Sequence, residues 1–209
     1  MNMLALILDI KLPHERHTLT MDPGTVLVID TETSGLPSRR SDYKDLPAWD
    51  SCRLVEIAWN LYTRGGVLLS SYTNVVKPDG FIISPGSEAI HGISTSHALS
   101  AGVPINQVWI DLEDVLRTRE VAIVVAHNAE FDNCVVKSEL LRHGRTDILK
   151  LWRKVPKYCT MLATTKPNEK YKKLTEAYFD TFGEMPSGTL HRAHADVEVC
   201  AQVYFQIDK

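Results

Sequence analysis

Residues 25–37 read TVLVIDTETSGLP, a run of β-branched and apolar residues that ends in acids and a turn. Such a run is typical of a buried central strand. Because successive side chains on a strand point to opposite faces, Asp30 and Glu32 are predicted to share one face at its end. Alone, this pair of acids also fits a solvated strand end. Gly35, in the following turn, is expected to let backbone amides approach a ligand.

The pattern beyond this strand predicts a mixed sheet. Two further strands, RLVEIAWNLY and VLLSSYTNVVK, are separated by Thr-Arg-Gly-Gly, a strong turn signal, and VAIVVAHN reads as a later buried strand. Helical spacing is found in INQVWIDLEDVLRTR, AEFDNCVVKSELLRHG, KKLTEAYFDTFG and RAHADVEVCAQVYFQ. Short helical or looped pieces are expected at PGSEAIHGIS and TSHALSAG, and a short strand or turn at KYCTMLA. Three antiparallel strands that lead into parallel crossover strands, flanked by helices, make an α/β domain.

Length and charge fit one domain. With 209 residues, 44% of them hydrophobic, the chain is long enough for one full core and too short for two large ones. We expect residues 23–209 to form this domain and residues 1–22 to be an appended strand, a partner contact or a loosely held arm. The net charge of −3 argues against a protein that coats nucleic acid, although an enzyme can confine its positive charge to one face.

The cysteines and the first residues favour a cytoplasmic protein. The four cysteines form no CxxC pair, so free thiols in a reducing compartment are expected rather than a zinc ribbon or a redox motif. The run MNMLALILDIKLP is short, has no basic leader and contains Asp9, so it fits neither a signal peptide nor a membrane span. No membrane contact is therefore expected, and the sequence does not indicate an oligomeric state.

Two further acids are placed to join the first pair. Asp132 follows a buried strand at the start of a helix, and Asp196 lies near the start of the last helix, in HRAHAD. Four converging carboxylates suit a pair of Mg²⁺ ions, for which Mn²⁺ is expected to substitute, and such a pair serves in-line displacement at phosphorus. His191 and His194 are the candidates for a general base that accepts a proton from the attacking water.

The segments IDTETSGLP, IHGIS, VAHNAEFD and HRAHAD together resemble the motifs of the DEDDh 3′-5′ exonucleases, which have a ribonuclease H-like fold. The resemblance spans residues 25 to about 206 and implies a two-metal nuclease that releases nucleoside 5′-monophosphates from the 3′ end of DNA or RNA, with a single-stranded end expected. The implied metal ligands are Asp30, Glu32, Asp132 and Asp196, and the implied general base is His191.

Other segments resemble the phage-type and bacterial stand-alone branch of this family more than polymerase-fused proofreading domains. They are TSGLP, LVEIAWNLY, KPDGFIIS, CTMLA and KKLTEAYFDTFG. Two features depart from the usual pattern without breaking it: Glu130 adds an acid to the second motif, and His194 adds a histidine to the third. They leave open which groups set the local pKa values.

The resemblance also implies residues that contact the substrate. Leu36 resembles the apolar wedge at the terminal base, and Thr33 the residue whose backbone meets the 3′ hydroxyl; core packing or turn capping are the alternatives. His91 and Phe131 resemble residues near the terminal nucleotide, with helix packing as the alternative for Phe131. His127 and its neighbour Asn128 are expected to have structural roles.

Positive charge is concentrated in one segment. Between Lys137 and Lys173 there are 11 basic and 3 acidic residues, so this segment carries +8 and the remainder carries −11. It either forms an ordinary solvated surface or guides a phosphate backbone. Residues 37–51 form a polar insertion in which Trp49 is expected to be free to stack on a base, whereas the other tryptophans are expected in the core or at its rim.

Two rival functions remain at this point. One is a module that binds nucleic-acid ends and has lost turnover, and the other is a metal-dependent phosphatase that acts on small molecules. The five catalytic residue types of the family are all present, which favours the exonuclease over the end-binding module, whereas a phosphatase would show little preference for polymers. The motifs do not distinguish DNA from RNA, because that choice rests on contacts to the 2′-hydroxyl.

Overall fold

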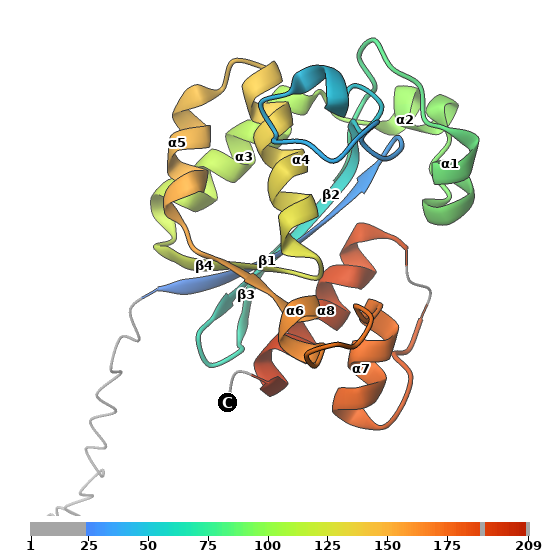
Figure 1. The fold of residues 1–209 in the computed structure, drawn as a ribbon. Coiled ribbons are helices and arrows are strands. Elements are labelled where there is room, and N and C mark those ends of the chain that lie inside the picture. Colours follow the sequence, from blue (N-terminus) through green and yellow to red (C-terminus); the bar gives the residue numbers. More distant parts are fainter. Residues whose placement is uncertain (1–23, 189–190, 208–209) are drawn as a thin grey trace, which may run out of the picture.

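The computed structural model describes residues 24–188 and 191–207, which form a mixed sheet covered by helices on both faces (Figure 1). The expected extension at residues 1–22 lies outside the described residues. The five strands follow the order β3-β2-β1-β4-β5 across the sheet. Their bounds are Thr25–Thr33 for β1, Leu54–Thr63 for β2, Leu68–Val75 for β3, Val121–Ala126 for β4 and Lys157–Cys159 for β5.

The pairing of these strands confirms the expected fold class. Strands β1, β2 and β3 are antiparallel neighbours, whereas β4 runs parallel to β1 and β5 runs parallel to β4. The sheet therefore combines an antiparallel meander with parallel crossover strands, as in the ribonuclease H-like fold. Strand β1 lies at the centre and is covered on both faces, which explains its uninterrupted apolar run.

The helices confirm the four segments with helical spacing and the two short pieces at α1 and α2, and they add two helices that were not predicted: α5, and α6 within KYCTMLA, where a short strand or turn was expected. Their bounds are Pro85–His91 for α1, Thr95–Ala101 for α2, Ile105–Thr118 for α3, Ala129–Arg142 for α4, Thr146–Lys154 for α5, Thr160–Thr164 for α6, Leu174–Phe182 for α7 and Ala193–Ile207 for α8. Helix α5 was not predicted, although Ile148, Leu149 and Trp152 lie on its buried side with helical spacing.

Alternate side chains of β1 point to opposite faces of the sheet and pack in two different hydrophobic cores. Leu27 and Ile29 pack in a core shared with α3, α4 and α5, whereas Val26 and Val28 pack in a core shared with α8. Figure 1 shows the same division, with α3, α4 and α5 on one side of the sheet and α8 on the other. The expected core tryptophans, Trp59, Trp109 and Trp152, are all buried. Each residue of β1 thus faces a known helix.

The polar insertion after β1 is folded and contains a 3-10 helix, η1 (Leu46–Trp49), that lies against α4. Trp49 is only 4% exposed, and its Nε1 donates to the Asp42 carbonyl at 3.2 Å. The expectation that Trp49 is free to stack on a base is therefore wrong, because the ring forms part of the core beneath the insertion.

Gly35 allows the two ends of this insertion to meet. A Cβ at Gly35 would lie 2.6 Å from the carbonyl oxygen of Ser51, which also accepts a hydrogen bond from Ser34 Oγ at 3.1 Å. In return, Ser51 Oγ donates to the Leu36 carbonyl at 2.7 Å. The space at Gly35 is thus used by the returning chain, and an approach of the neighbouring amides to a ligand stays a prediction.

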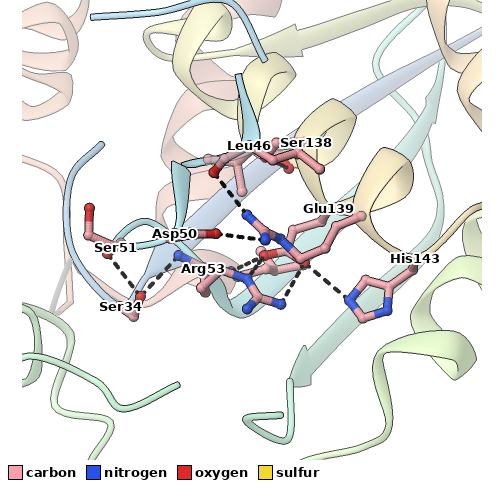
Figure 2. A network of polar contacts seen from close by, with 11 residues as sticks. Ser34, Leu46, Asp50, Ser51, Arg53, Ser138, Glu139 and His143 are labelled. Atoms are coloured by element: carbon pink, nitrogen blue, oxygen red, sulfur yellow. Dashed lines mark hydrogen bonds and ion pairs between the residues drawn. The ribbon is translucent and has the colours of Figure 1, made fainter. Parts of the chain in front are cut away.

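A buried polar network fixes the insertion to α4 (Figure 2). The guanidinium of Arg53 makes a two-pronged ion pair with Glu139, and His143 contacts the same carboxylate at 3.3 Å. Ser34 Oγ accepts from the Arg53 amide at 2.9 Å, and Asp50 pairs with an arginine of α4 at 2.7 Å. These contacts join the end of β1, the insertion and α4, which are the segments that surround the site.

All four cysteines carry free thiols, as expected. Within residues 24–188 and 191–207, no helix is both long enough and apolar enough to cross a lipid bilayer.

Candidate metal-binding and catalytic site

Three carboxylates meet at the end of β1. Asp30 and Glu32 continue the face of β1 on which Val26 and Val28 pack against α8, and Asp196 lies in the first turn of α8. One carboxylate oxygen from each of the three acids lies within 4.8 Å of the other two. The prediction that Asp30 and Glu32 share one face is confirmed, and α8 brings the third acid to that face.

Asp132 approaches the same end of β1 from the other side. It lies in the first turn of α4, and its Oδ1 accepts hydrogen bonds from the Thr31 amide at 3.0 Å and the Thr31 hydroxyl at 2.7 Å. Thr31 continues the face of Leu27 and Ile29, which α4 covers. Asp132 is therefore outside the group of three, although its charge is, after burial, the largest cause that raises the pKa of Asp30.

Burial raises the pKa of every acid in this set. Repulsion from other carboxylates adds to it at Asp30, Glu32 and Asp132, whereas contacts with His191, Arg192 and His194 oppose it at Asp196. The pKa of Asp30 lies well above its usual value, and that of Glu32 rises to about 8 because of burial, Asp196 and the further acid Glu56. A bound cation would reduce the repulsion among these carboxylates and favour their charged forms.

Glu56 and Arg192 were not identified from the sequence. Glu56 is fully buried on β2, directly opposite Glu32 in the strand register. Its carboxylate accepts hydrogen bonds from both Nε and Nη2 of Arg192, the shortest at 2.6 Å, and from the Ala193 amide at 2.9 Å. The pair ties the start of α8 to the sheet. Burial and the neighbouring acids raise the pKa of Glu32, and the Arg192 guanidinium offsets part of this rise.

His191 lies in the segment before α8, because the helix begins at Ala193. Its backbone has φ of +68°, and its amide donates to Asp196 Oδ2 at 2.9 Å. Gly188 has φ of +90°, so the chain bends there before it reaches His191. The imidazole of His191 is exposed and its charge lowers the pKa of Asp196, which places it next to the cluster; His194 is exposed in the first turn of the helix.

The four expected substrate contacts lie in different environments. Leu36 is 74% exposed, as an apolar wedge would be, whereas Thr33 is buried and its hydroxyl donates to the Gly35 carbonyl. His91 is buried at the end of α1, and its Nε2 has no hydrogen-bond partner among the described residues. Phe131 is half-buried and packs its ring against Trp49, with centroids 6.5 Å apart.

Two residues of the basic segment and the second motif have structural roles. His127 hydrogen-bonds through Nδ1 to the Thr160 hydroxyl and through Nε2 to the Lys172 carbonyl, each at 2.9 Å. The Nζ of Lys172 pairs with Asp180 at 2.6 Å and donates to a backbone carbonyl. Lys172 therefore has a structural role. Any contact between the basic segment and a phosphate has to come from other residues of that segment.

Comparisons with known proteins agree with this geometry. A family model described as exonuclease, RNase_T, matches residues 27–204. Crystal structures of Escherichia coli exonuclease I share the fold: a complex with single-stranded DNA is 15% identical with a TM-score of 0.65, and covers 88% of this chain and 40% of that one. A complex with a dA16 oligonucleotide is 15% identical with a TM-score of 0.66 and coverages of 88% and 41%.

A moderately thermophilic exonuclease I from Methylocaldum szegediense is 18% identical, with a TM-score of 0.65 and coverages of 88% and 40%. The chain thus spans about two fifths of the length of these structures. No protein of curated function matches the sequence.

Proposed function

The chain belongs to the RNase_T exonuclease family of the DEDDh superfamily, and from this membership we propose that it is a metal-dependent 3′-5′ exonuclease that releases nucleoside 5′-monophosphates. The observation that carries the proposal is the cluster of Asp30, Glu32 and Asp196, with Asp132 held beside it by Thr31. The substrate we propose is the single-stranded 3′ end of DNA or RNA. Exonuclease I complexes with single-stranded DNA support this choice.

The donor set fits hard divalent cations. All four proposed ligands offer carboxylate oxygens, which Mg²⁺ and Mn²⁺ prefer, and no thiol or imidazole belongs to the group of three. The repulsion that raises their pKa values is the electrostatic cost that a cation removes. When bound, two such ions supply charge neutralisation and a lowered pKa for the attacking water. We propose Asp30, Glu32, Asp132 and Asp196 as their ligands.

The chain's own residues then have separate tasks. His191, on the exposed segment before α8, accepts the proton of the attacking water as general base. Its amide contact with Asp196 couples the position of that segment to the carboxylate cluster. Leu36 and Phe131 present apolar surface to the terminal nucleotides. The unpartnered Nε2 of His91 offers a hydrogen bond to the terminal nucleotide from within the fold.

A single assay tests the reaction and its direction. Single-stranded DNA and RNA oligonucleotides, each labelled at the 5′ end, are incubated with the protein and Mg²⁺, with either end blocked. We expect a ladder that shortens from the 3′ end, no products in excess EDTA, and protection when the 3′ end is blocked. Products that shorten from the 5′ end, or full activity in EDTA, would overturn the proposal.

The same panel distinguishes the two rival functions. An end-binding module retards the labelled oligonucleotide without shortening it. A small-molecule phosphatase hydrolyses phosphate monoesters and shows no preference for a polymer. Asp30→Asn serves as the matched control, because it removes one ligand oxygen charge while preserving the side-chain shape.

Two further parts of the proposal concern the protein as a whole. We propose residues 23–209 as the catalytic domain, in keeping with the continuous sheet and cores of the described residues. We also propose a cytoplasmic location, since all four cysteines are free thiols.

A further inference from the structure

A cavity of about 450 Å³ lies between the insertion and the start of α4, within the size range of ligand sites. It is formed by the insertion, the start of α4 and two segments near α6, and we call it the insertion pocket. Its principal lining residues are Pro37, Arg40, Trp49, Phe131, Met161 and Tyr171. Two of these lining residues adjoin residues of the proposed active site in the chain: Pro37 follows the exposed Leu36, and Phe131 precedes Asp132.

The walls of this pocket suit a flat aromatic ligand. Trp49 and Phe131 form one wall, with rings tilted by 44° and centroids 6.5 Å apart. On another side of the pocket, the side chain of Tyr171 is 60% exposed, which is unusual for a large aromatic residue. Nucleobases stack on such side chains irrespective of sequence, since every base has a π-face. Met161 adds a polarizable apolar contact.

The insertion wall is already ordered without a ligand. Ser38 donates its amide to the Ala48 carbonyl at 2.9 Å, which closes the insertion on itself. Arg142 of α4 pairs with Asp50 at 2.7 Å and donates to the Leu46 carbonyl at 3.3 Å. Figure 2 shows Leu46 and Asp50 turned toward α4 in this network. A wall that is ordered beforehand lowers the entropic cost of binding.

The opposite wall is fixed through its backbone. Tyr171 precedes Lys172, whose amide donates to Thr165 Oγ1 at 3.3 Å and whose carbonyl accepts from His127 at 2.9 Å. These two contacts hold the main chain on one side of Tyr171, so its exposed ring does not depend on a loose loop for its position. His127 belongs to the second motif, which links the ring to the segment that carries Asp132.

The rim of the pocket carries one cation, Arg40, and one acid, Glu130, and both are exposed. Glu130 accepts hydrogen bonds from Asn133 Nδ2 at 3.5 Å and Cys134 Sγ at 3.3 Å, so Arg40 is the group at the pocket that is suited to a phosphate. An exposed guanidinium next to aromatic walls matches the chemistry of a single strand, with phosphate outside and base inside.

We propose that the insertion pocket binds an unpaired nucleobase of the substrate strand on the 5′ side of the terminal nucleotide, with Tyr171 stacked on the base and Arg40 near its phosphate. The inference rests on the proposed function, because it assumes that a nucleic-acid strand enters the neighbouring site. It assigns a role in strand recognition to the insertion, which lies between the first motif and β2.

The test couples one base of the substrate to one side chain of the protein. Single-stranded oligonucleotides carry one abasic site at position two, three, four or five from the 3′ end, and their affinities are measured by fluorescence anisotropy with Ca²⁺ in place of Mg²⁺. Tyr171→Ala should weaken binding of the intact strand about tenfold, the usual worth of one stacked base. At one of the four positions, removal of the base should weaken binding to the parent protein by the same factor of about ten. Removal of that base should cause no further loss of affinity in Tyr171→Ala, because the side chain on which the base stacks is already absent.

Matched variants separate stacking from other effects. Tyr171→Phe keeps the ring and should bind like the parent, and Phe179→Ala removes another exposed aromatic side chain, on α7, without effect. Arg40→Ala should flatten the salt dependence of binding, whereas Tyr171→Ala should leave its slope unchanged. Additive losses at all four positions would overturn the inference. If the parent protein binds with the expected coupling but never shortens the strand in Mg²⁺, the proposed function fails and the pocket assignment stands.

Discussion

Replacing Glu32 with Gln should stabilise the metal-free protein at alkaline pH while abolishing activity. The pKa of Glu32 is raised from 4.5 to about 8, chiefly by burial and then by the neighbouring acids. The folded protein therefore holds a proton that the unfolded chain releases between these two values. Since the folded state binds more protons, stability falls as pH rises from about 4.5 and levels off above about 8. Glu32→Gln removes this loss.

The size of the effect follows from the same two pKa values. Their difference corresponds to at most about 5 kcal/mol, at about 1.4 kcal/mol per pKa unit. Glu32 is partly exposed and its pKa depends on the charges of Asp196, Glu56 and Asp132, so solvent screening and coupling reduce this figure. We expect the measured gain at pH 8 to be about 2 kcal/mol, or about 4–8 °C in Tm for a domain of this size.

Urea denaturation in EDTA at pH 5 and pH 8 measures the change. The variant should match the parent at pH 5 and exceed it at pH 8, and Mg²⁺ should narrow the gap, because a bound cation stabilises the parent more. Glu130→Gln is the control: it removes an exposed acid of the second motif and should change neither curve. A Glu32→Gln variant that loses stability at pH 8, or gains equally at both values, would refute the electrostatic reasoning.

Three further predictions follow from the contacts of the site. Steady-state kinetics should show that His191→Ala lowers kcat by about 10²–10⁴ with little change in KM, whereas the kcat of His194→Ala stays within about threefold of the parent value. The reverse order would mean that the general base is misassigned. Glu56→Gln should lower kcat and cost about 2 kcal/mol in urea denaturation, because it weakens a buried ion pair; unchanged kcat would limit that pair to a structural role. Gly35→Ala should cost about 1–3 kcal/mol in the same measurement, since its Cβ would lie 2.6 Å from a backbone oxygen, and a neutral result would show that the insertion yields easily.

The local periodicity of the sequence was sufficient to predict the strands and the two acids of the site that lie on β1. Alternation along β1 places Asp30 and Glu32 on one face, and no tertiary information is needed for that. The contact between Asp132 and Thr31 depends on which face of the sheet α4 covers, and no short-range pattern contains this information. The sequence therefore predicted that Asp132 joins the site, but not that it approaches from the opposite face of β1.

Two errors arose where burial overrides composition. The insertion is rich in polar residues, which made Trp49 look exposed; its ring is buried because Arg142 and Lys137 of α4 hold the insertion down, the latter over the ring of Tyr43 at 4.3 Å. Helix α5 was missed because its apolar positions are embedded among charges, although their spacing is helical. A contact distant in sequence thus decided the burial of Trp49, whereas the spacing within α5 was a local signal.

Glu56 shows why register matters for reading this site. In RLVEIAWNLY it is one acid within an apolar strand, and its type alone suggests an exposed position or an error in strand assignment. Only the antiparallel pairing of β1 with β2 sets it opposite Glu32, and only the packing of α8 on that face brings Arg192 within 2.6 Å. A fully buried carboxylate requires a charged partner, and here the partner adjoins His191 in the chain. The ion pair that satisfies Glu56 thus fixes the end of the segment that carries the proposed base, so the electrostatics of the sheet and the position of that base depend on the same contact.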